Sequence, residues 1–108
     1  IGNDVWTGHY VYITDQNHGY ENVDIPISQQ TQMERAVSIG DGSWLGAGTV
    51  VLPGAQIGKH VAVGANSVVT GALPDYCVAV GVPARVIKQY SKESGWVASN
   101  YFNEDGSN

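Results

Sequence analysis

The stretch SIGDGSWLGAGTVVLPGAQIGKHVAVGANSVVTG, residues 38–71, carries an aliphatic side chain at every sixth position: Ile39, Leu45, Val51, Ile57, Val63 and Val69. An α-helix repeats every 3.6 residues and a half-buried strand every 2 residues, so neither accounts for this spacing. Divided into sixes from Ile39, the blocks read IGDGSW, LGAGTV, VLPGAQ, IGKHVA, VGANSV and VTGALP. The repeating unit is therefore a block of six residues.

Two positions in each block suit a protein interior. The first is aliphatic, and the fifth is mostly small: Ser43, Thr49, Ala55, Val61, Ser67 and Leu73. Both can face inward if each block is a short strand followed by a bend. The glycine that is second in four of the six blocks then lies near the bend, where positive φ or tight packing is tolerated. Three such strands form one triangular coil, and stacked coils form a β-solenoid, which this regularity favours over a sandwich.

The repeat extends toward the N-terminus and is interrupted once. Residues 1–12 read IGNDVW and TGHYVY in the same register, and Ile13 opens a third block. The pattern then stops, and Ile39 is out of phase with Ile1 by two residues, which indicates a loop inserted at about residues 14–35. The period does not give the handedness of the coil, although the usual rule for parallel crossovers favours a right-handed one.

Composition limits the partners of the chain. A length of 108 residues suits one domain, and 43% hydrophobic residues are typical of a folded chain. No apolar run is long enough for a membrane span, and a net charge of −5 with five basic residues argues against binding nucleic acid. The single Cys77 cannot form an internal disulfide, which favours the cytoplasm. The pattern is already under way at Ile1, so we expect the natural N-terminus to lie upstream.

Besides the hexads, three segments carry a resemblance to a known family: ITDQNHGYENVDIPISQQ (13–30), SWLGAGTVVLPG (43–54) and GVPARVIKQY (81–90). In this order they resemble the hexapeptide-repeat acyltransferases, in the branch of galactoside, maltose and xenobiotic O-acetyltransferases. The resemblance covers residues 1–90 as one domain. It implies an all-β fold, a left-handed parallel β-helix, which is an exception to the crossover rule. It also implies a homotrimer that binds acetyl-CoA in a cleft between neighbouring subunits.

Residues 91–108 carry no hexad and end in a polar run. We expect them to form an irregular C-terminal tail with a mobile end. Trp96 and the pair Tyr101–Phe102 are expected to pack back over the last coil, because an open sheet edge invites pairing with another chain.

Acyl transfer from a thioester to a hydroxyl requires a base for the acceptor's proton and hydrogen-bond donors for the oxyanion. His18 is the candidate base, because a neutral imidazole accepts a proton near neutral pH and the family's catalytic histidine matches this position. Asp15 or Glu21 could orient the ring, and the sequence does not choose between them. The resemblance assigns the oxyanion to the backbone N–H of Ala47. The acceptor would be a hydroxyl of a sugar, a glycan or a xenobiotic.

The resemblance also places five residues around CoA. Trp44 matches an indole beside the pantetheine arm, and Ala65 and Thr70 match positions that touch the CoA chain. Arg85 and Lys88 match the segment that meets the phosphates. A guanidinium offers phosphate oxygens two parallel hydrogen bonds, whereas an ammonium acts as a point charge. No metal ion is implied.

Two alternatives remain beside the enzyme. His9 and His60 are third and fourth in their blocks and are expected to face outward. Three histidines raise the possibility of a gamma-class carbonic anhydrase, which shares the left-handed helix and binds zinc through three histidines. Two of those ligands lie close together in sequence, whereas here nine residues separate His9 from His18 and forty-two separate His18 from His60. The other alternative is a non-catalytic trimeric β-helix that has lost its acceptor site.

Overall fold

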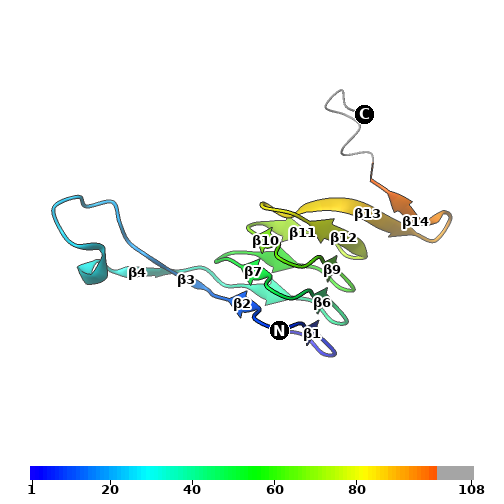
Figure 1. Cartoon of the computed structure of the whole chain (residues 1–108), viewed down its shortest axis with the longest axis horizontal. Helices are drawn as coiled ribbons and strands as arrows, with labels where there is room; N and C mark the ends of the chain where they lie inside the picture. The colour runs from blue at the N-terminus through cyan, green and yellow to red at the C-terminus, as the bar shows by residue number, and fades with distance from the viewer. Residues whose placement is uncertain (100–108) are drawn as a thin grey trace, which may run out of the picture.

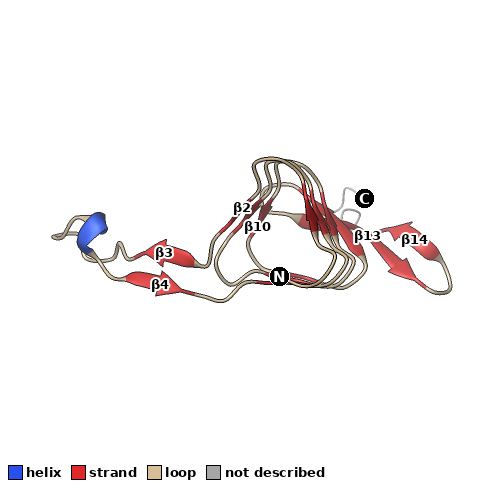
Figure 2. Cartoon of the chain, turned by 90° about the horizontal axis from the view of Figure 1, so that it is seen from below, coloured by secondary structure: helices blue, strands red, loops and turns tan. Residues whose placement is uncertain are grey.

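The computed structural model describes residues 1–99. Its main body is a triangular coil of very short strands, seen end-on in Figure 2. Each strand of the coil is followed by a turn, so the chain changes direction after every hexad. The coil strands are β1 (Trp6–Thr7), β2 (Tyr12–Ile13), β5 (Ser38–Ile39), β6 (Trp44–Leu45), β7 (Val50–Val51), β8 (Gln56–Ile57), β9 (Ala62–Val63), β10 (Val68–Val69), β11 (Ala72–Leu73) and β12 (Cys77–Val80).

Three parallel sheets form the sides of the coil, and we number them as faces. Face 1 contains β1, β6, β9 and β12; face 2 contains β2, β7 and β10; face 3 contains β5, β8 and β11. Trp44 pairs with Ala62, which lies three hexads further along the chain. One turn of the coil therefore takes three hexads, and the predicted left-handed parallel β-helix is confirmed.

The interior of the coil follows the hexads. From Ile39 to Leu73 the side chains at the first and fifth positions of the blocks are all buried, and Pro53 is buried as well. The polar ones among them have partners, as burial requires. The Ser43 hydroxyl donates to the Gly58 carbonyl at 2.9 Å and accepts the Val61 N–H at 3.0 Å, and the Thr49 hydroxyl donates to the Gly64 carbonyl at 3.3 Å. The small fifth-position residues therefore join successive coils from inside.

The second-position glycines are needed for close packing and not for positive φ. A Cβ on Gly46 would lie 2.7 Å from the backbone nitrogen of Ala65 in the next coil, closer than real contacts allow. Positive φ falls instead at the fourth position, as at Gly48 (75°) and His60 (52°). In each hexad, close packing against the next coil is thus met at the second position and positive φ at the fourth.

The insertion leaves the coil between face 2 and face 3 as an extended arm (Figures 1 and 2). Within it, β3 (Gln16–His18) pairs antiparallel with β4 (Gln32–Glu34), and a single 3₁₀ turn, η1 (Ile27–Gln29), lies between the two strands. Trp6 still pairs with Trp44 on either side of the insertion, so the arm adds residues without shifting the register of the coil.

The structure differs from the expected irregular tail over residues 91–98. Strands β13 (Arg85–Ser91) and β14 (Gly95–Ala98) form an antiparallel hairpin that extends face 1 beyond β12. Ala84 and Val86 pack against the end of the core, so the start of β13 and not Trp96 covers the last coil. The antiparallel partner satisfies the open edge of β12. The expectations for Tyr101 and Phe102 lie outside the described residues.

Within residues 1–99 no helix is long and apolar enough to cross a membrane.

Candidate functional site

His18 is the last residue of β3 and lies on the exposed surface of the arm. It stands opposite Gln32 in the β3–β4 pair. The next residue, Gly19, is buried, and its N–H donates to the Thr31 carbonyl at 3.0 Å. A Cβ on Gly19 would meet that carbonyl oxygen at 2.8 Å. The backbone beside His18 is therefore held on both sides while its imidazole faces outward.

The two acidic residues near His18 in sequence differ in their contacts. The Glu21 carboxylate accepts the N–H of Tyr20 through Oε1 at 3.0 Å, whereas Asp15 accepts the N–H of Arg35 at 2.9 Å through its backbone carbonyl and not through its carboxylate. No hydrogen bond joins either carboxylate to His18 within the described part of the chain. The choice between Asp15 and Glu21 as the orienting group therefore stays open.

Gln30 closes the tip of the arm, a role that the sequence does not signal. Its Nε2 donates to the carbonyls of Asn22 at 2.9 Å and Ile25 at 2.8 Å, and its Oε1 accepts the Asn22 N–H at 3.3 Å. Beside this clamp lies an open hollow at the tip of the arm, which Gly19 borders but His18 does not. It is lined by Gly19, Glu21, Asn22, Ile25, Gln29, Gln30, Thr31 and Met33. Amide, carboxylate and apolar groups together suit a hydroxylated ligand.

Ala47 and Ala65 are stacked at the corner between face 1 and face 2. The Ala47 carbonyl accepts the Asn66 N–H at 2.9 Å, which links the two turns. The N–H groups on either side of Ala47 are used, by Gly46 toward Val63 and by Gly48 toward His9. The N–H of Ala47 itself has no acceptor within residues 1–99, and the residue is exposed. Ala47 thus carries a backbone donor without an acceptor among the described residues, and only the hydrogen-bearing Cα of Gly8 in the preceding coil lies near its nitrogen, where a Cβ would approach to 2.7 Å.

Trp44 and Lys88 lie on the outer surface of face 1. Trp44 pairs with Ala62, Ala62 with Val78, and Val78 with Lys88 across the antiparallel join. Residues paired in this way project to the same side of a sheet. An exposed indole and an ammonium are thus joined by a strip of two small apolar side chains.

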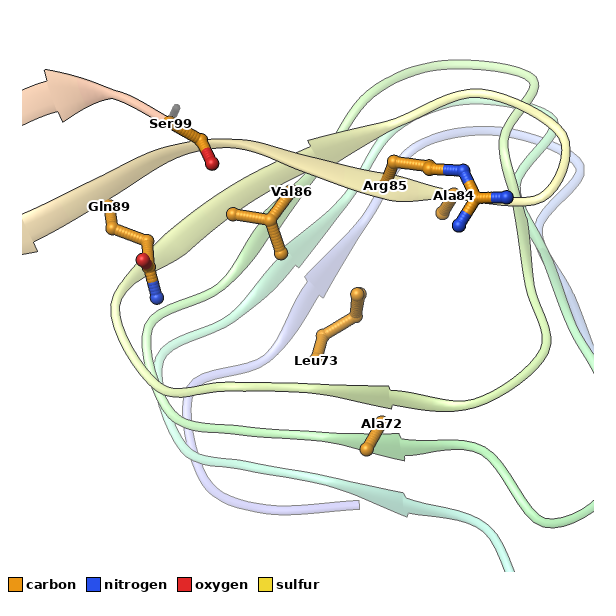
Figure 3. Close-up of a pocket in the computed structure, with 7 residues that line it drawn as sticks. All are labelled: Ala72, Leu73, Ala84, Arg85, Val86, Gln89 and Ser99. Atoms are coloured by element: carbon orange, nitrogen blue, oxygen red, sulfur yellow. The ribbon is translucent and has the colours of Figure 1, made fainter. Parts of the chain in front are cut away.

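Arg85 and Thr70 lie elsewhere on the coil. Thr70 follows β10 at the corner between face 2 and face 3, above the point where the arm leaves. Arg85 begins β13 and borders a hollow at the C-terminal end of the coil, at the opposite end from Gln89 (Figure 3). Leu73 and Val86 point into this hollow from below and above (Figure 3).

The three histidines occupy three separate places. His9 lies at the corner between face 1 and face 2, His18 on the arm, and His60 at the corner between face 3 and face 1. Among the described residues no three His, Cys, Asp or Glu side chains are grouped as metal ligands would be. The arrangement gives no support to the zinc alternative.

Cys77 is buried on β12. Burial, with a smaller contribution from the charge of Asp75, raises the pKa of its thiol to about 11. Because the thiolate is the reactive form, this side chain is a poor nucleophile near neutral pH. Acyl transfer through Cys77 is therefore disfavoured, and direct attack by the acceptor is the simpler chemistry.

A single chain does not bring the predicted residues together. Ala47 and Ala65 lie at one end of face 2, whereas the arm that carries His18 leaves from the other end and points away from the coil (Figure 2). A site that uses both His18 and the Ala47 N–H therefore requires a second copy of the chain.

Comparisons with known proteins agree with the fold. Residues 36–71 match the model of the bacterial transferase hexapeptide family (six repeats). WbbJ of Escherichia coli strain K12, named as a lipopolysaccharide biosynthesis O-acetyl transferase, is 45% identical over 101 residues, which cover 87% of this chain and 52% of WbbJ. The chain therefore spans about half the length of this relative.

Two solved structures share the architecture. A galactoside acetyltransferase in complex with coenzyme A superposes with a TM-score of 0.73 at 28% identity, covering 90% of this chain and 51% of that chain. A maltose O-acetyltransferase from Clostridium difficile 630 superposes with a TM-score of 0.71 at 29% identity, covering 84% of this chain and 58% of that one. Each of the two structures thus matches more than four fifths of this chain.

Proposed function

The chain belongs to the hexapeptide-repeat transferases, in the branch of galactoside and maltose O-acetyltransferases, and from this we propose that it is a CoA-dependent O-acyltransferase. It would move an acetyl group from acetyl-CoA to a hydroxyl of a sugar, glycan or xenobiotic. The unpaired N–H of Ala47 at an exposed corner is the observation that carries this proposal, because an oxyanion needs a donor that is already in place. The cytoplasm, which suits the free Cys77, is the proposed location.

The mechanism needs one base and one oxyanion site. The acceptor hydroxyl attacks the carbonyl carbon of the thioester while neutral His18 takes the hydroxyl proton. The carbonyl oxygen becomes negative and receives a hydrogen bond from the Ala47 N–H. The tetrahedral intermediate then collapses, the carbon–sulfur bond breaks, and the leaving CoA thiolate takes the proton from His18. The products are the acetyl ester and CoA thiol.

CoA is proposed to lie along the corner and face 1. Trp44 would flank the pantetheine arm, and Ala65 would touch it at the corner. Thr70 of a neighbouring subunit, which lies at the far side of that subunit's face 2, would also contact the CoA molecule. Arg85 and Lys88 would hold the phosphates. In a chain with a net charge of −5, these two cations are the local attraction for an anionic ligand.

We expect acetyl-CoA to be consumed only when a suitable acceptor is present. Release of CoA thiol, followed with a thiol reagent against a panel of mono-, di- and oligosaccharides and phenolic hydroxyl compounds, measures this directly. CoA binding without turnover on any acceptor would favour the non-catalytic scaffold.

A homotrimer is the proposed assembly. The outward side chains of face 2 are apolar, at Tyr12, Val50 and Val68, whereas those of face 3 are Ser38, Gln56 and Ala72. The arm also exposes Val23 and Met33, and large exposed apolar areas indicate a contact surface. Light scattering of the full chain is expected to give three times the protomer mass of 11.5 kDa. A monomer at micromolar concentration would remove the interfacial site.

Substitution of Arg85 by alanine is expected to weaken CoA binding about 10- to 150-fold, the effect of losing a charge-assisted hydrogen bond. Titration calorimetry at low and high salt measures it, and the loss should shrink as salt screens the phosphates. Lys92→Ala, on the hairpin turn, is the matched control and should change the affinity less. Equal affinities of the Arg85 variant and the parent protein would place the phosphates elsewhere.

A further inference from the structure

Both strands of the arm are hydrogen-bonded to the coil at the place where the arm begins, which we name the arm root: Thr14, Asp15 and Arg35. On the outgoing side the Thr14 N–H donates to the Val51 carbonyl at 3.0 Å. On the returning side the Gly54 N–H donates to the Arg35 carbonyl at 3.1 Å. The two sides are joined to each other, since the Arg35 N–H donates to the Asp15 carbonyl at 2.9 Å. The backbone therefore fixes where the arm leaves the coil.

The side chain of Arg35 adds a packing contact to the arm root. Gly54, at the corner between face 2 and face 3, has a φ of 83°. A Cβ built on Gly54 would lie 2.8 Å from the Cζ of Arg35 and 3.0 Å from both its Nε and its Nη2. Such nearly equal distances to three atoms of a planar group require a point above its plane. The guanidinium of Arg35 therefore lies flat over the corner at Gly54.

Beyond its root the arm has little to hold it in one direction. Strands β3 and β4 extend away from the coil (Figure 2), and every residue of both strands is exposed. A side-chain hydrogen bond joins the two strands, from the Gln16 Nε2 to the Glu34 Oε2 at 3.1 Å. A two-stranded hairpin on its own is only marginally stable in water. The direction of the arm therefore depends on the contacts at its root.

The arm root controls the position of His18, which ends β3 three residues after Asp15. At about 3.3 Å per residue His18 stands about 10 Å from the root, so a tilt of the arm by about 6° moves it about 1 Å. A displacement of about 1 Å can lower a catalytic rate about 10²-fold. In the proposed reaction His18 also has to meet the Ala47 N–H of a second copy. The base is therefore sensitive to the direction in which the arm leaves the coil.

We propose that Arg35 is a positioning residue: its guanidinium, packed flat on Gly54, sets the direction of the arm and so places His18 against the thioester held by a neighbouring subunit. The inference rests on the proposed function and adds to it the residue that keeps the base in place. Arg35 acts through His18 and touches neither substrate. A guanidinium suits this role because it is planar and rigid, whereas the ammonium of a lysine is a point charge on a flexible stem.

Hydrogen exchange of the full chain tests whether Arg35 holds the arm root, independently of any reaction. In Arg35→Ala the amides of Thr14 and Gly54 are expected to exchange several-fold faster, because local opening becomes easier when a contact at the root is lost. Amides inside the coil should keep the rate of the parent protein. The Trp44 N–H, which donates to the Val61 carbonyl at 2.9 Å, is a suitable reporter for the coil.

Steady-state kinetics then test the positioning. Arg35→Ala is expected to lower kcat about 10- to 100-fold, while the affinity for CoA and the trimer mass persist. Added to His18→Ala, the same change should cause no further loss, because a residue that acts through the base has no effect once the base is gone. Arg35→Lys keeps the charge without the plane and should behave like Arg35→Ala. Lys59→Ala, which removes another exposed cation at a corner of the coil, is the matched control and should leave kcat unchanged.

The outcomes separate this inference from the proposed function. If the parent protein is active and Arg35→Ala has the same kcat, with or without faster exchange, the inference is wrong and the transferase proposal stands. Faster exchange throughout the coil or a changed trimer mass would show a general structural role of Arg35. Full activity of Arg35→Lys, or a further loss in the His18→Ala background, would show that Arg35 acts in another way, and each of these results overturns the inference. A parent protein that acetylates no acceptor overturns the proposed function and the inference with it.

Discussion

Replacement of His18 by alanine is expected to lower kcat about 10²- to 10⁴-fold, because the acceptor hydroxyl loses its general base. His18 is exposed on the arm, so its removal leaves no cavity in the coil. The proposed CoA contacts of Trp44 and Arg85 also remain. The affinity for CoA and the trimer mass are therefore expected to persist, which steady-state kinetics, calorimetry and light scattering would establish on the same sample.

His9→Ala is the matched control, since His9 is also an exposed histidine but lies at a corner of the coil. Its kcat should equal that of the parent protein. Undiminished turnover by the His18 variant would mean that another group removes the proton, and the arm would then be only a subunit contact.

Replacement of Leu45 by alanine is expected to lower the free energy of unfolding by about 2–5 kcal/mol, the range for large-to-small changes in a packed core. Leu45 is fully buried on β6, and its paired neighbours Thr7 and Val63 lie in the coils directly below and above. The coil is too narrow to rearrange around a lost side chain without disturbing these neighbours. Urea unfolding, followed by circular dichroism and extrapolated to water, measures the change.

The unfolding experiment must be run at one protomer concentration, because association adds to apparent stability. Ile1→Ala is a suitable control, since Ile1 is 79% exposed and its truncation should cost little. A Leu45 variant as stable as the parent protein would contradict the hexad as the source of the core.

The arm shows how far the candidate site could be predicted from the sequence. The broken period placed an insertion at residues 14–35, and His18 within it was singled out as the base. The clamp of Gln30 on Asn22 and Ile25 had no signal, because glutamine is common in loops and its partners lie five and eight residues away. The hollow at the tip of the arm depends on that closure and so was not foreseen.

The C-terminal side was predicted less well. Residues 91–98 have no hexad, and they belong to an antiparallel hairpin of β13 and β14. The hairpin joins the coil through the pairing of β12 with β13, whose register slips between Val78 and Ala79. A slip of this kind depends on how β13 meets the end of the coil, which local pattern does not encode. The ring contacts of Tyr90 with Tyr76 and of Trp96 with His60 also depend on this pairing.

The sequence by itself determined the coil, the inward positions and the place of the arm, because these depend on a six-residue repeat that each block carries locally. The tertiary structure alone decided three things: which glycines serve close packing, that the Ala47 N–H stays unpaired, and that four aromatic side chains from distant segments share one surface. The physical reason is that each of these depends on the distance between neighbouring coils or strands. Such distances are fixed only when segments far apart in the chain come into contact.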